Sequence, residues 1–454
     1  MKYVHFIAIG GSVMHNLAIA LHKKGYQVSG SDDEIFEPSA GRLKKHNIHP
    51  DRKGWDPSKI HSNLDAVILG MHAKSDNPEL KKAQELGLPV FSFPEYLYEQ
   101  TKDKKRIVIG GSHGKTTITS MVMHVLKNAG YKFDYMVGAQ IEGFDTMVGL
   151  NHDSNIAIFE GDEYLSSPID KRPKFHLYKA HVGLISGIAW DHINVFPTYE
   201  SYKKQFHIFT ETIEPEGTLI YNETDPEVKD ILPNRKDISL IPYSFHTSIN
   251  RNGTSFLTDG KDKVPVKIFG KHNMANIEAA KKICLSLGIP DNVFYKTIQS
   301  FAGAAKRLQL LAQKENTRVF LDFAHAPSKL KATTNAVKSQ FPENELIACM
   351  ELHTFSSLSK NFLNQYHNSM QAADIAMIYI NPETVKHKNL KILNKEDIQS
   401  AFNSDQLTVF FDKKELFDTL KKLQLTNRNV LFMTSGNFDG VDFISFSENL
   451  ISTL

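Results

Sequence analysis

Cysteine is scarce in this sequence, with only Cys284 and Cys349 among 454 residues. Two cysteines are too few for a disulfide scaffold, and both stand in apolar surroundings that are typical of buried thiols. Because thiols stay reduced in the cytosol, this usage favours a cytoplasmic protein.

Long hydrophobic runs and an excess of charge are also missing. No stretch approaches 18 apolar residues, so we expect no membrane span, and the apolar run at residues 3–9 is too short for a signal peptide. The 53 basic and 51 acidic residues leave a net charge of +2, which does not favour a nucleic-acid or anionic-membrane partner. We therefore expect no nucleic acid and no membrane as partner, and a monomer or homodimer that acts on small molecules.

Strand-like and helix-like segments alternate along much of the chain, a pattern that predicts right-handed βαβ units and parallel sheets. The expected strands are 4–9, 27–31, 66–69, 90–93, 107–109, 156–159, 182–185, 319–323, 346–350, 375–380, 407–411 and 429–433. The expected helices include 15–24, 40–46, 78–86, 118–127, 328–339, 358–372 and 413–423. We predict an α/β fold of three domains in series, each with a mainly parallel sheet. These are an N-terminal Rossmann-like domain (1–103), a central P-loop ATPase domain (104–304) and a C-terminal Rossmann-like domain (305–454), with the charged run 102–106 as a linker.

The most informative motif is Gly110-Gly111-Ser112-His113-Gly114-Lys115-Thr116-Thr117. It stands between an apolar strand and a helix, the order typical of a phosphate-binding loop, although Ile109 replaces the first glycine of the full pattern. Glycines let successive N–H groups converge on an anion, and the helix N-terminus adds its positive dipole end. We expect Lys115 to reach the β- and γ-phosphates of ATP and the Thr116 hydroxyl to ligate Mg²⁺.

Acidic residues follow the next strand, in Glu160-Gly161-Asp162-Glu163. Carboxylates at the carboxyl end of a strand fit a divalent-metal site beside the phosphate loop, and a solvated acidic turn is the alternative. Trp190-Asp191-His192 follows the strand at 182–185. Its histidine is either structural or a metal ligand, and Mg²⁺ by itself prefers oxygen.

Other polar positions allow two interpretations each. Asn273 and Asn276, in a helix expected to end near residue 285, can pair with an adenine edge or simply cap the helix. Arg307 can reach phosphate oxygens or pair with a surface carboxylate. The polar turns 322–327, 353–357 and 435–440 end strands of the third domain and should share one rim of its sheet.

The first domain has a glycine turn at Gly10-Gly11-Ser12, but Ala8 and Val13 replace two glycines of the dinucleotide fingerprint. A nicotinamide-dependent oxidoreductase is therefore a poor alternative, although Asp32 stands where an acidic residue can hold a ribose hydroxyl. A P-loop nucleotide switch is the other alternative of a different class.

Taken in order, these motifs resemble the Mur ligase family of peptidoglycan precursor synthesis over nearly the whole chain. The resemblance is carried by residues 111–117, 160–163, 191–192, 272–276, 307 and 322–327. It implies that Lys115, Glu163 and His192 are catalytic and that Mg²⁺ is bound by Thr116, Glu163 and His192. It implies ATP binding by Gly111, Ser112, His113, Gly114, Lys115, Thr116, Thr117, Asn273 and Arg307. The acceptor UDP-N-acetylmuramate would bind to Gly10, Gly11, Ser12 and Asp32, and the amine substrate to His325, His353, Ser435 and Asn437.

Two activities compete within the family. One adds L-alanine to UDP-N-acetylmuramate, and the other adds the recycled tripeptide L-alanyl-γ-D-glutamyl-meso-diaminopimelate, in both cases with ATP through an acyl phosphate. Three features resemble the tripeptide ligase: the segment Asp170-Lys171-Arg172-Pro173-Lys174-Phe175, Val13 in place of a glycine, and the turn at 433–440. We therefore expect a tripeptide ligase of peptidoglycan recycling, with the alanine ligase as the alternative.

Some positions depart from the family pattern. Ala326 replaces a second histidine, and His353 and Thr354 stand where an arginine-bearing motif is usual, so the group that contacts the incoming carboxylate is open. His207 stands near the position of a carbamylated lysine in some members. Chemistry that relies on that lysine is therefore not expected here.

Overall fold

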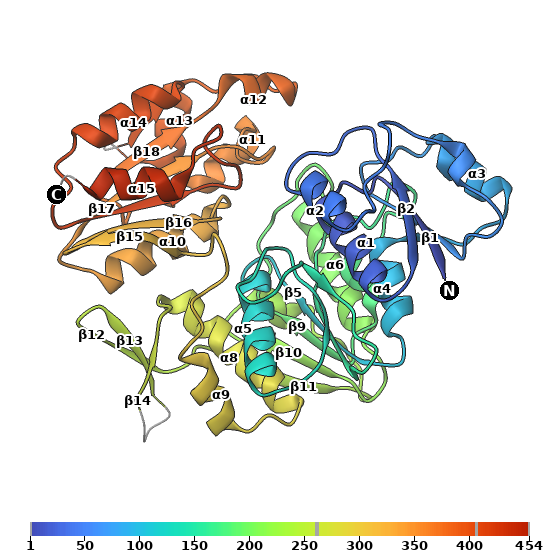
Figure 1. Ribbon diagram of the computed structural model, residues 1–454. Helices are drawn as coiled ribbons and strands as arrows, with labels where there is room; N and C mark the ends of the chain where they lie inside the picture. Colours follow the sequence, from blue (N-terminus) through green and yellow to red (C-terminus); the bar gives the residue numbers. More distant parts are fainter. Residues whose placement is uncertain (1, 259–262, 405–406, 453–454) are drawn as a thin grey trace. The chain divides into compact units, whose positions relative to one another are not determined.

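The computed structural model describes residues 2–258, 263–404 and 407–452, and the chain divides into two compact units (Figure 1). The first comprises Met1–Ile188, Lys203–Ser244 and Ala279–Thr297, and the second comprises Ala189–Tyr202, Phe245–Glu278 and Ile298–Leu454. Both units are built from helices and mainly parallel sheets, which confirms the predicted α/β class. The boundaries of the three expected domains stay a prediction.

The N-terminal sheet is wholly parallel, with strand order β2-β1-β3-β4. Its apolar strands are buried because helices cover them, as Leu80 and Ala83 do on one face. The strands are β1 (Tyr3–Ile7), β2 (Gln27–Ser31), β3 (Ala66–Leu69) and β4 (Val90–Ser92). The helices are α1 (Ser12–Lys23), α2 (Ser39–Lys45), α3 (Pro78–Glu85) and α4 (Phe93–Thr101), with a 3-10 turn at Pro57–Lys59.

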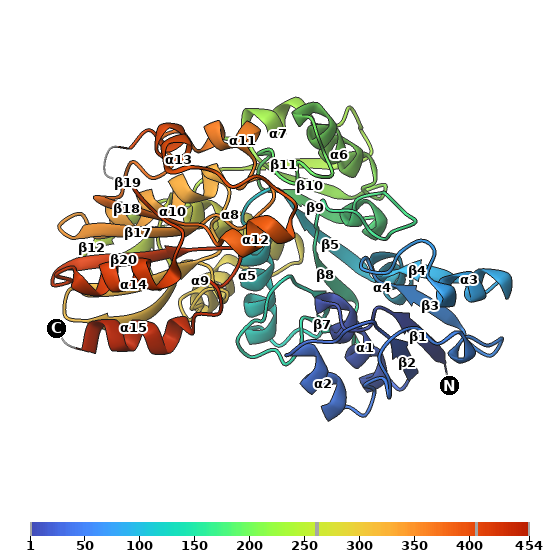
Figure 2. The ribbon, with the colours of Figure 1, turned by 90° about the horizontal axis from the view of Figure 1, so that it is seen from above.

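The seven-stranded central sheet has the order β11-β10-β9-β5-β8-β6-β7, and only β7 is antiparallel to its neighbour. Figure 2 shows β9, β5 and β8 side by side in its middle. The strands are β5 (Lys105–Gly110), β6 (Asp134–Met136), β7 (Val148–Gly149), β8 (Ile156–Glu160), β9 (Val182–Ile185), β10 (Thr218–Asn222) and β11 (Ser239–Tyr243). The helices that follow in sequence are α5 (Lys115–Asn128), a 3-10 helix (Lys174–Tyr178), α6 (Tyr199–Glu211), α7 (Pro226–Asp230), α8 (Lys271–Ser286) and α9 (Asp291–Ile298).

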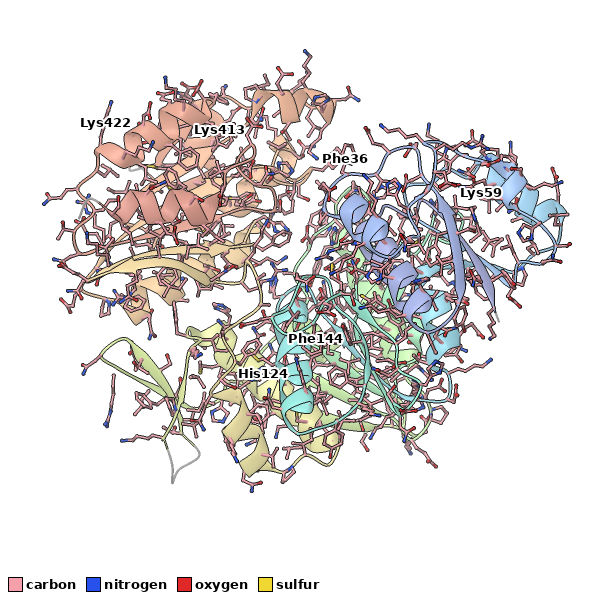
Figure 3. All side chains as sticks on the ribbon, viewed as in Figure 1. Phe36, Lys59, His124, Phe144, Lys413 and Lys422 are labelled. Carbon is pink, nitrogen blue, oxygen red and sulfur yellow. The ribbon has the colours of Figure 1, made fainter. Side chains whose placement is uncertain are left out.

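Helix α5 carries the phosphate loop at its N-terminus, and polar contacts fix its other end. The Nε2 atom of His124 lies 3.1 Å from the carbonyl oxygen of Thr297 at the end of α9 (Figure 3). The Lys127 ammonium lies 4.9 Å from the ring centre of Phe144 and donates to the Gly143 carbonyl. These contacts hold the helix while its buried face packs on β5 and β8.

The second unit contains two sheets. A small antiparallel sheet consists of β12 (Ser248–Arg251), β13 (Thr254–Thr258) and β14 (Lys263–Val266). The larger has the order β15-β16-β20-β17-β18-β19, with only β15 antiparallel. Successive residues of one central strand, such as Ala348 and Cys349, belong to separate apolar clusters, because their side chains point to opposite faces of the sheet. Its strands are β15 (Gln309–Lys314), β16 (Thr317–Asp322), β17 (Glu345–Glu351), β18 (Ile375–Tyr379), β19 (Leu407–Phe410) and β20 (Arg428–Met433).

The helices around this sheet differ from prediction in one place. The expected helix at 358–372 is wrong: α11 covers only Lys360–Leu363 and a 3-10 turn covers Asn364–Tyr366. The chain turns there because the buried Tyr366 donates from its hydroxyl to the His325 carbonyl at 2.5 Å, and Asn368 adopts a left-handed φ of 56°. The other helices are α10 (Pro327–Gln340), α12 (Pro382–His387), α13 (Lys395–Phe402), α14 (Lys413–Lys422) and α15 (Phe443–Ser452).

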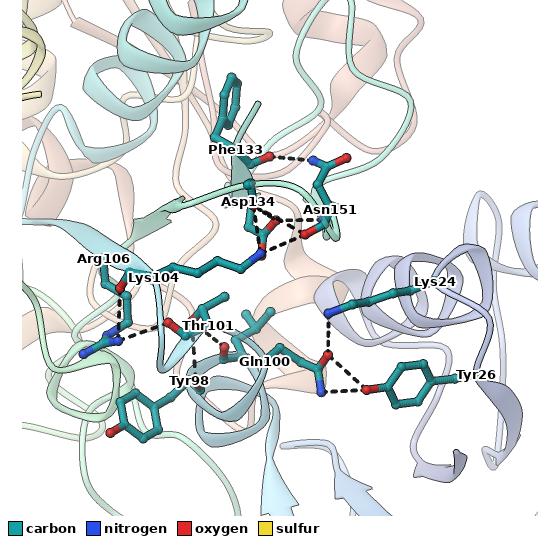
Figure 4. A network of polar contacts seen from close by, with 12 residues as sticks. Lys24, Tyr26, Tyr98, Gln100, Thr101, Lys104, Arg106, Phe133, Asp134 and Asn151 are labelled. Carbon is teal, nitrogen blue, oxygen red and sulfur yellow. Dashed lines mark hydrogen bonds and ion pairs between the residues drawn. The ribbon is translucent and has the colours of Figure 1, made fainter. Parts of the chain in front are cut away.

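The charged run at 102–106, predicted to be a linker, connects α4 to β5 but is partly buried. Strand β5 begins inside it, and Lys104 and Arg106 are buried. The Lys104 ammonium donates to a carboxylate oxygen of Asp134 at 2.7 Å and to the Asn151 carbonyl at 2.8 Å (Figure 4). The Arg106 guanidinium donates to the Thr101 carbonyl at 3.0 Å, so both cations are satisfied inside the unit.

No helix within the described ranges is both long enough and apolar enough to cross a membrane.

We expect Asp134→Asn to destabilise the first unit. The exchange leaves the buried Lys104 ammonium without its carboxylate, which typically costs about 3–5 kcal/mol. Urea unfolding followed by circular dichroism measures the loss. Asp153→Asn is the matched control, because its ion pair with Lys132 is exposed and contributes at most about 1 kcal/mol. Equal unfolding midpoints of the two variants would contradict this account.

Candidate functional site

The phosphate loop leaves the carboxyl end of β5 and enters α5 through two glycines with positive φ, 128° at Gly111 and 73° at Gly114. A Cβ atom on Gly111 would collide with Ser186, which follows β9. The Ser112 amide donates to the Gly187 carbonyl at 2.9 Å and fixes the loop to that neighbouring segment. The glycines predicted to shape the turn are therefore required by its geometry.

Lys115, the first residue of α5, lies in an ion pair. Its ammonium is 2.5 Å from a carboxylate oxygen of Glu163, and the two side chains are 15% and 1% exposed. Burial alone would lower the pKa of Lys115, but the nearby Glu163 and Asp162 carboxylates outweigh it and raise that pKa. A fixed positive charge therefore stands at the phosphate loop.

Thr116 contacts Glu160, the first residue of the acidic motif. Its hydroxyl donates to a carboxylate oxygen of Glu160 at 2.9 Å, and the other oxygen of Glu160 accepts from the Gly138 amide at 2.7 Å. The sequence analysis included Glu160 in the acidic motif but assigned only Glu163 as a metal ligand. The available signal for Glu160 was its position as the last residue of β8, the strand beside β5, since parallel strands end at the same edge. Hydroxyl and carboxylate oxygens are the donors that Mg²⁺ prefers.

Gly10 and Asp32, two of the residues predicted to bind the acceptor, are in contact at the glycine turn after β1. The Gly10 amide donates to a carboxylate oxygen of Asp32 at 2.7 Å, and α1 begins at Ser12 directly after the turn. Ala8 adopts a φ of 65°, so an alanine takes the left-handed conformation where the fingerprint has glycine. Burial, with the neighbouring Asp33, raises the pKa of Asp32 to about 6.

The second unit contains Asp191 and His192. A carboxylate oxygen of Asp191 lies 3.7 Å from the Lys329 ammonium and 3.8 Å from the Nε2 atom of His325. Despite burial, the Lys329 ammonium lowers the pKa of Asp191, while burial and Lys329 lower the pKa of His325 to about 3. His325 is therefore neutral at pH 7. His192 and Glu163 belong to different units, so their joint binding of a metal stays a prediction.

Asn273 and Arg307, the other residues predicted to bind ATP, contact neighbouring groups of the protein. The buried Asn273 amide donates to the Phe269 carbonyl at 2.9 Å, and Asn276 donates to Asn273 at 3.2 Å. The Arg307 guanidinium carbon lies 4.5 Å from the ring centre of Phe323. Their roles toward ATP stay predictions. On α6, the Nδ1 atom of His207 lies 3.2 Å from the Ile231 carbonyl.

The turns after β17 and β20 bring together three predicted amine-site residues, and a carboxylate that the prediction missed. Glu351, the last residue of β17, accepts from the Thr434 hydroxyl and from the Phe438 amide, and lies 3.6 Å from the His353 ring. Burial would raise the pKa of Glu351, but these hydrogen bonds lower it. Ser435 has a buried hydroxyl without a hydrogen-bond partner in the described structure, and Asn437 accepts from Gly440.

Family models match most of the chain. The model of the Mur ligase family catalytic domain matches residues 3–105, and that of the Mur ligase middle domain matches residues 109–284. These segments contain the Gly10 turn, the phosphate loop and the acidic motif.

Individual relatives point to two activities. A UDP-N-acetylmuramate–L-alanine ligase of Caldicellulosiruptor bescii is 31% identical over 395 residues, 83% of each chain. A UDP-N-acetylmuramate–L-alanyl-γ-D-glutamyl-meso-2,6-diaminoheptandioate ligase of Haemophilus influenzae is 26% identical over 452 residues, 97% of this chain and 98% of its own. The crystal structure of a murein peptide ligase from Psychrobacter arcticus has a TM-score of 0.67 at 22% identity and covers 100% of this chain and 98% of that one. At that identity the structural likeness shows the fold alone.

We expect binding of UDP-N-acetylmuramate to weaken on the order of tenfold between pH 7.5 and pH 5. The Asp32 carboxyl, with its pKa of about 6, gains a proton in this range and loses acceptor capacity, whereas the pyrophosphate of the ligand does not titrate. Calorimetry at several pH values measures the change. Asp32→Asn should remove most of the pH dependence, and a parent curve that coincides with that of the variant would exclude Asp32 from the site.

Proposed function

This chain belongs to the Mur ligase family, whose members are ATP-dependent ligases that form amide bonds, and on this premise we propose its reaction. It joins the amino group of L-alanyl-γ-D-glutamyl-meso-diaminopimelate to the lactyl carboxylate of UDP-N-acetylmuramate, in the cytoplasm, for peptidoglycan recycling. The observation that carries the ligase chemistry is the positive charge of Lys115, 15% exposed at a glycine turn, beside the carboxylates of Glu160, Asp162 and Glu163.

The proposed reaction has two steps. The acceptor carboxylate attacks the γ-phosphate of ATP, which gives an acyl phosphate and ADP, and the peptide amine then attacks the acyl carbon and phosphate leaves. A carboxylate is a poor acyl donor, so phosphorylation supplies its leaving group. Phosphoryl transfer depends mainly on positioning and charge neutralisation, which the loop amides and Lys115 provide. An α-amino group with a pKa of about 8 is partly neutral at pH 7 and needs no strong base.

The donors around Thr116 fit a magnesium ion. We propose Thr116 and Glu163 as its ligands and add Glu160, whose carboxylate already contacts the Thr116 hydroxyl. When bound, the metal would neutralise charge on the transferred phosphate. Glu163 would have to exchange the Lys115 ammonium for the ion, and this exchange is possible because the phosphates of ATP give Lys115 a new partner. His192 stays a proposed ligand.

The other substrate contacts are proposed by position. ATP is held by residues 111–117, with Asn273 and Arg307 at its nucleoside and phosphate ends. Gly10, Gly11, Ser12 and Asp32 bind the UDP moiety at the carboxyl edge of the first sheet, where open α/β sheets bind ligands. The corresponding edge of the C-terminal sheet binds the peptide through His325, His353, Ser435 and Asn437.

Two observations support the tripeptide as amine substrate. A relative named for the tripeptide matches 97% of this chain, and the segment 170–175 resembles the corresponding segment expected of tripeptide ligases. L-alanine is the second candidate, favoured by the higher identity of the ligase from C. bescii.

We expect phosphate release from ATP with UDP-N-acetylmuramate to require the tripeptide and to be at least tenfold slower with L-alanine at equal concentration. A continuous phosphate assay measures both rates, and Lys115→Ala serves as the inactive control. A faster reaction with L-alanine would replace the proposed substrate, and release from neither mixture would reject the ligase itself.

We expect Glu160→Gln and Glu163→Gln each to raise the Mg²⁺ concentration for half-maximal rate on the order of tenfold, a usual effect of removing a ligand or its supporting group. Glu142→Gln is the control, because Glu142 is exposed. The measurement is a magnesium titration of the same assay. A titration curve that coincides with that of the control removes the residue from the metal site.

A further inference from the structure

The turn at residues 170–174 has no part in the chemistry described above, yet it is firmly built. The Asp170 carboxylate accepts from Arg172 at Nε and Nη2, with distances of 2.6 to 3.1 Å, and this closes the turn. Arg172 also donates to Glu95 at 3.1 Å. Because the other oxygen of Glu95 accepts from the Ser92 amide in a capping box, the turn is fixed to the N-terminus of α4.

Lys174 projects from this turn toward the acidic motif. Its ammonium lies 2.5 Å from a carboxylate oxygen of Asp162 and 5.6 Å from the ring centres of both Phe93 and Tyr164. The side chain is only 15% exposed. Aromatic faces stabilise a cation and exclude water from it, which strengthens any further hydrogen bond that it makes.

The three carboxylates of the acidic motif thus have three separate partners. Glu160 contacts Thr116, Glu163 contacts Lys115, and Asp162 contacts Lys174. Lys115 is assigned to the phosphates of ATP, so Lys174 is a second ammonium on the same short motif. Its aromatic neighbour Phe93 directly follows β4, at the carboxyl edge where Gly10 follows β1. The second cation is therefore at the edge proposed for the acceptor.

The proposed reaction requires a cation at such a place. A carboxylate must approach a triphosphate, and the two anions repel each other unless positive charge is near both. We propose that Lys174 binds the lactyl carboxylate of the acceptor and positions it for attack, an inference that rests on the proposed function. An ammonium has three donors, and Asp162 takes one, so the carboxylate can be bound without loss of the existing contact.

The test compares two nucleotide sugars. UDP-N-acetylglucosamine is the same molecule as UDP-N-acetylmuramate except for the lactyl ether and its carboxylate. We expect the parent to bind UDP-N-acetylmuramate about 10- to 100-fold more tightly, the usual contribution of a charged hydrogen bond. Lys174→Met should bind both sugars equally by calorimetry and keep its affinity for a non-hydrolysable ATP analogue. The matched control is Lys171→Met, which alters an exposed lysine of the same turn and should keep the preference.

The outcomes separate this inference from the proposed function. An active parent whose preference survives in Lys174→Met overturns the role of Lys174 and leaves the ligase intact. A parent that binds neither nucleotide sugar and releases no phosphate with them overturns the proposed function. Lys174→Gln, whose amide can still donate to Asp162, removes the charge with less change of packing and should show the same loss of preference. In the assay, both neutral variants should raise KM for the acceptor and not KM for ATP.

Discussion

The ion pair between Lys115 and Glu163 is the interaction on which the active centre depends. A buried ammonium without a partner would be strongly destabilising, so the phosphate loop cannot present its lysine unless a carboxylate is delivered to the same place. The parallel pairing of β5 with β8 delivers it, because Ile109 at the end of one strand lies beside Glu160 at the end of the other. The acidic motif therefore stabilises the buried lysine in the absence of nucleotide. When ATP binds, its phosphates must replace the ion pair between Lys115 and Glu163.

The same principle joins the first sheet to the central one. Glu95 in α4 accepts from Arg172 of the turn after the acidic motif. An uncharged contact adds to this ion pair, since Asn16 of α1 accepts from the Met147 amide. An ion pair and an uncharged hydrogen bond thus connect the two sheets of the first unit. A substrate held on the first sheet therefore keeps its position relative to the loop when both are part of one packed body.

The sequence was sufficient to predict those parts of the fold and of the site in which the local residues are compatible with only one backbone structure. The glycines of the phosphate loop were predictable because glycine adopts their positive φ values at the least cost, and the apolar strands were predictable because helices bury both faces of a parallel sheet. The burial of Lys104 and Arg106 was not predictable from the sequence. A run of charged residues does not indicate which partners, 30 or more positions away in sequence, its side chains will meet. Glu351 was missed for a related reason. It is a single carboxylate at a strand end, and its importance depends on which strand lies beside it.

The C-terminal edge has a buried carboxylate beside a histidine. Glu351 places a carboxylate under the turn that carries Ser435, and His353, which stands where the family resemblance implies an arginine, pairs with that carboxylate. Free L-alanine has a carboxylate next to its reacting amine, and a site with a buried negative charge and no arginine would hold it poorly. In the tripeptide that carboxyl group is already an amide, and the free carboxylates lie farther along the chain. If the reacting end binds at this edge, the replacement of arginine by histidine favours the peptide over the amino acid.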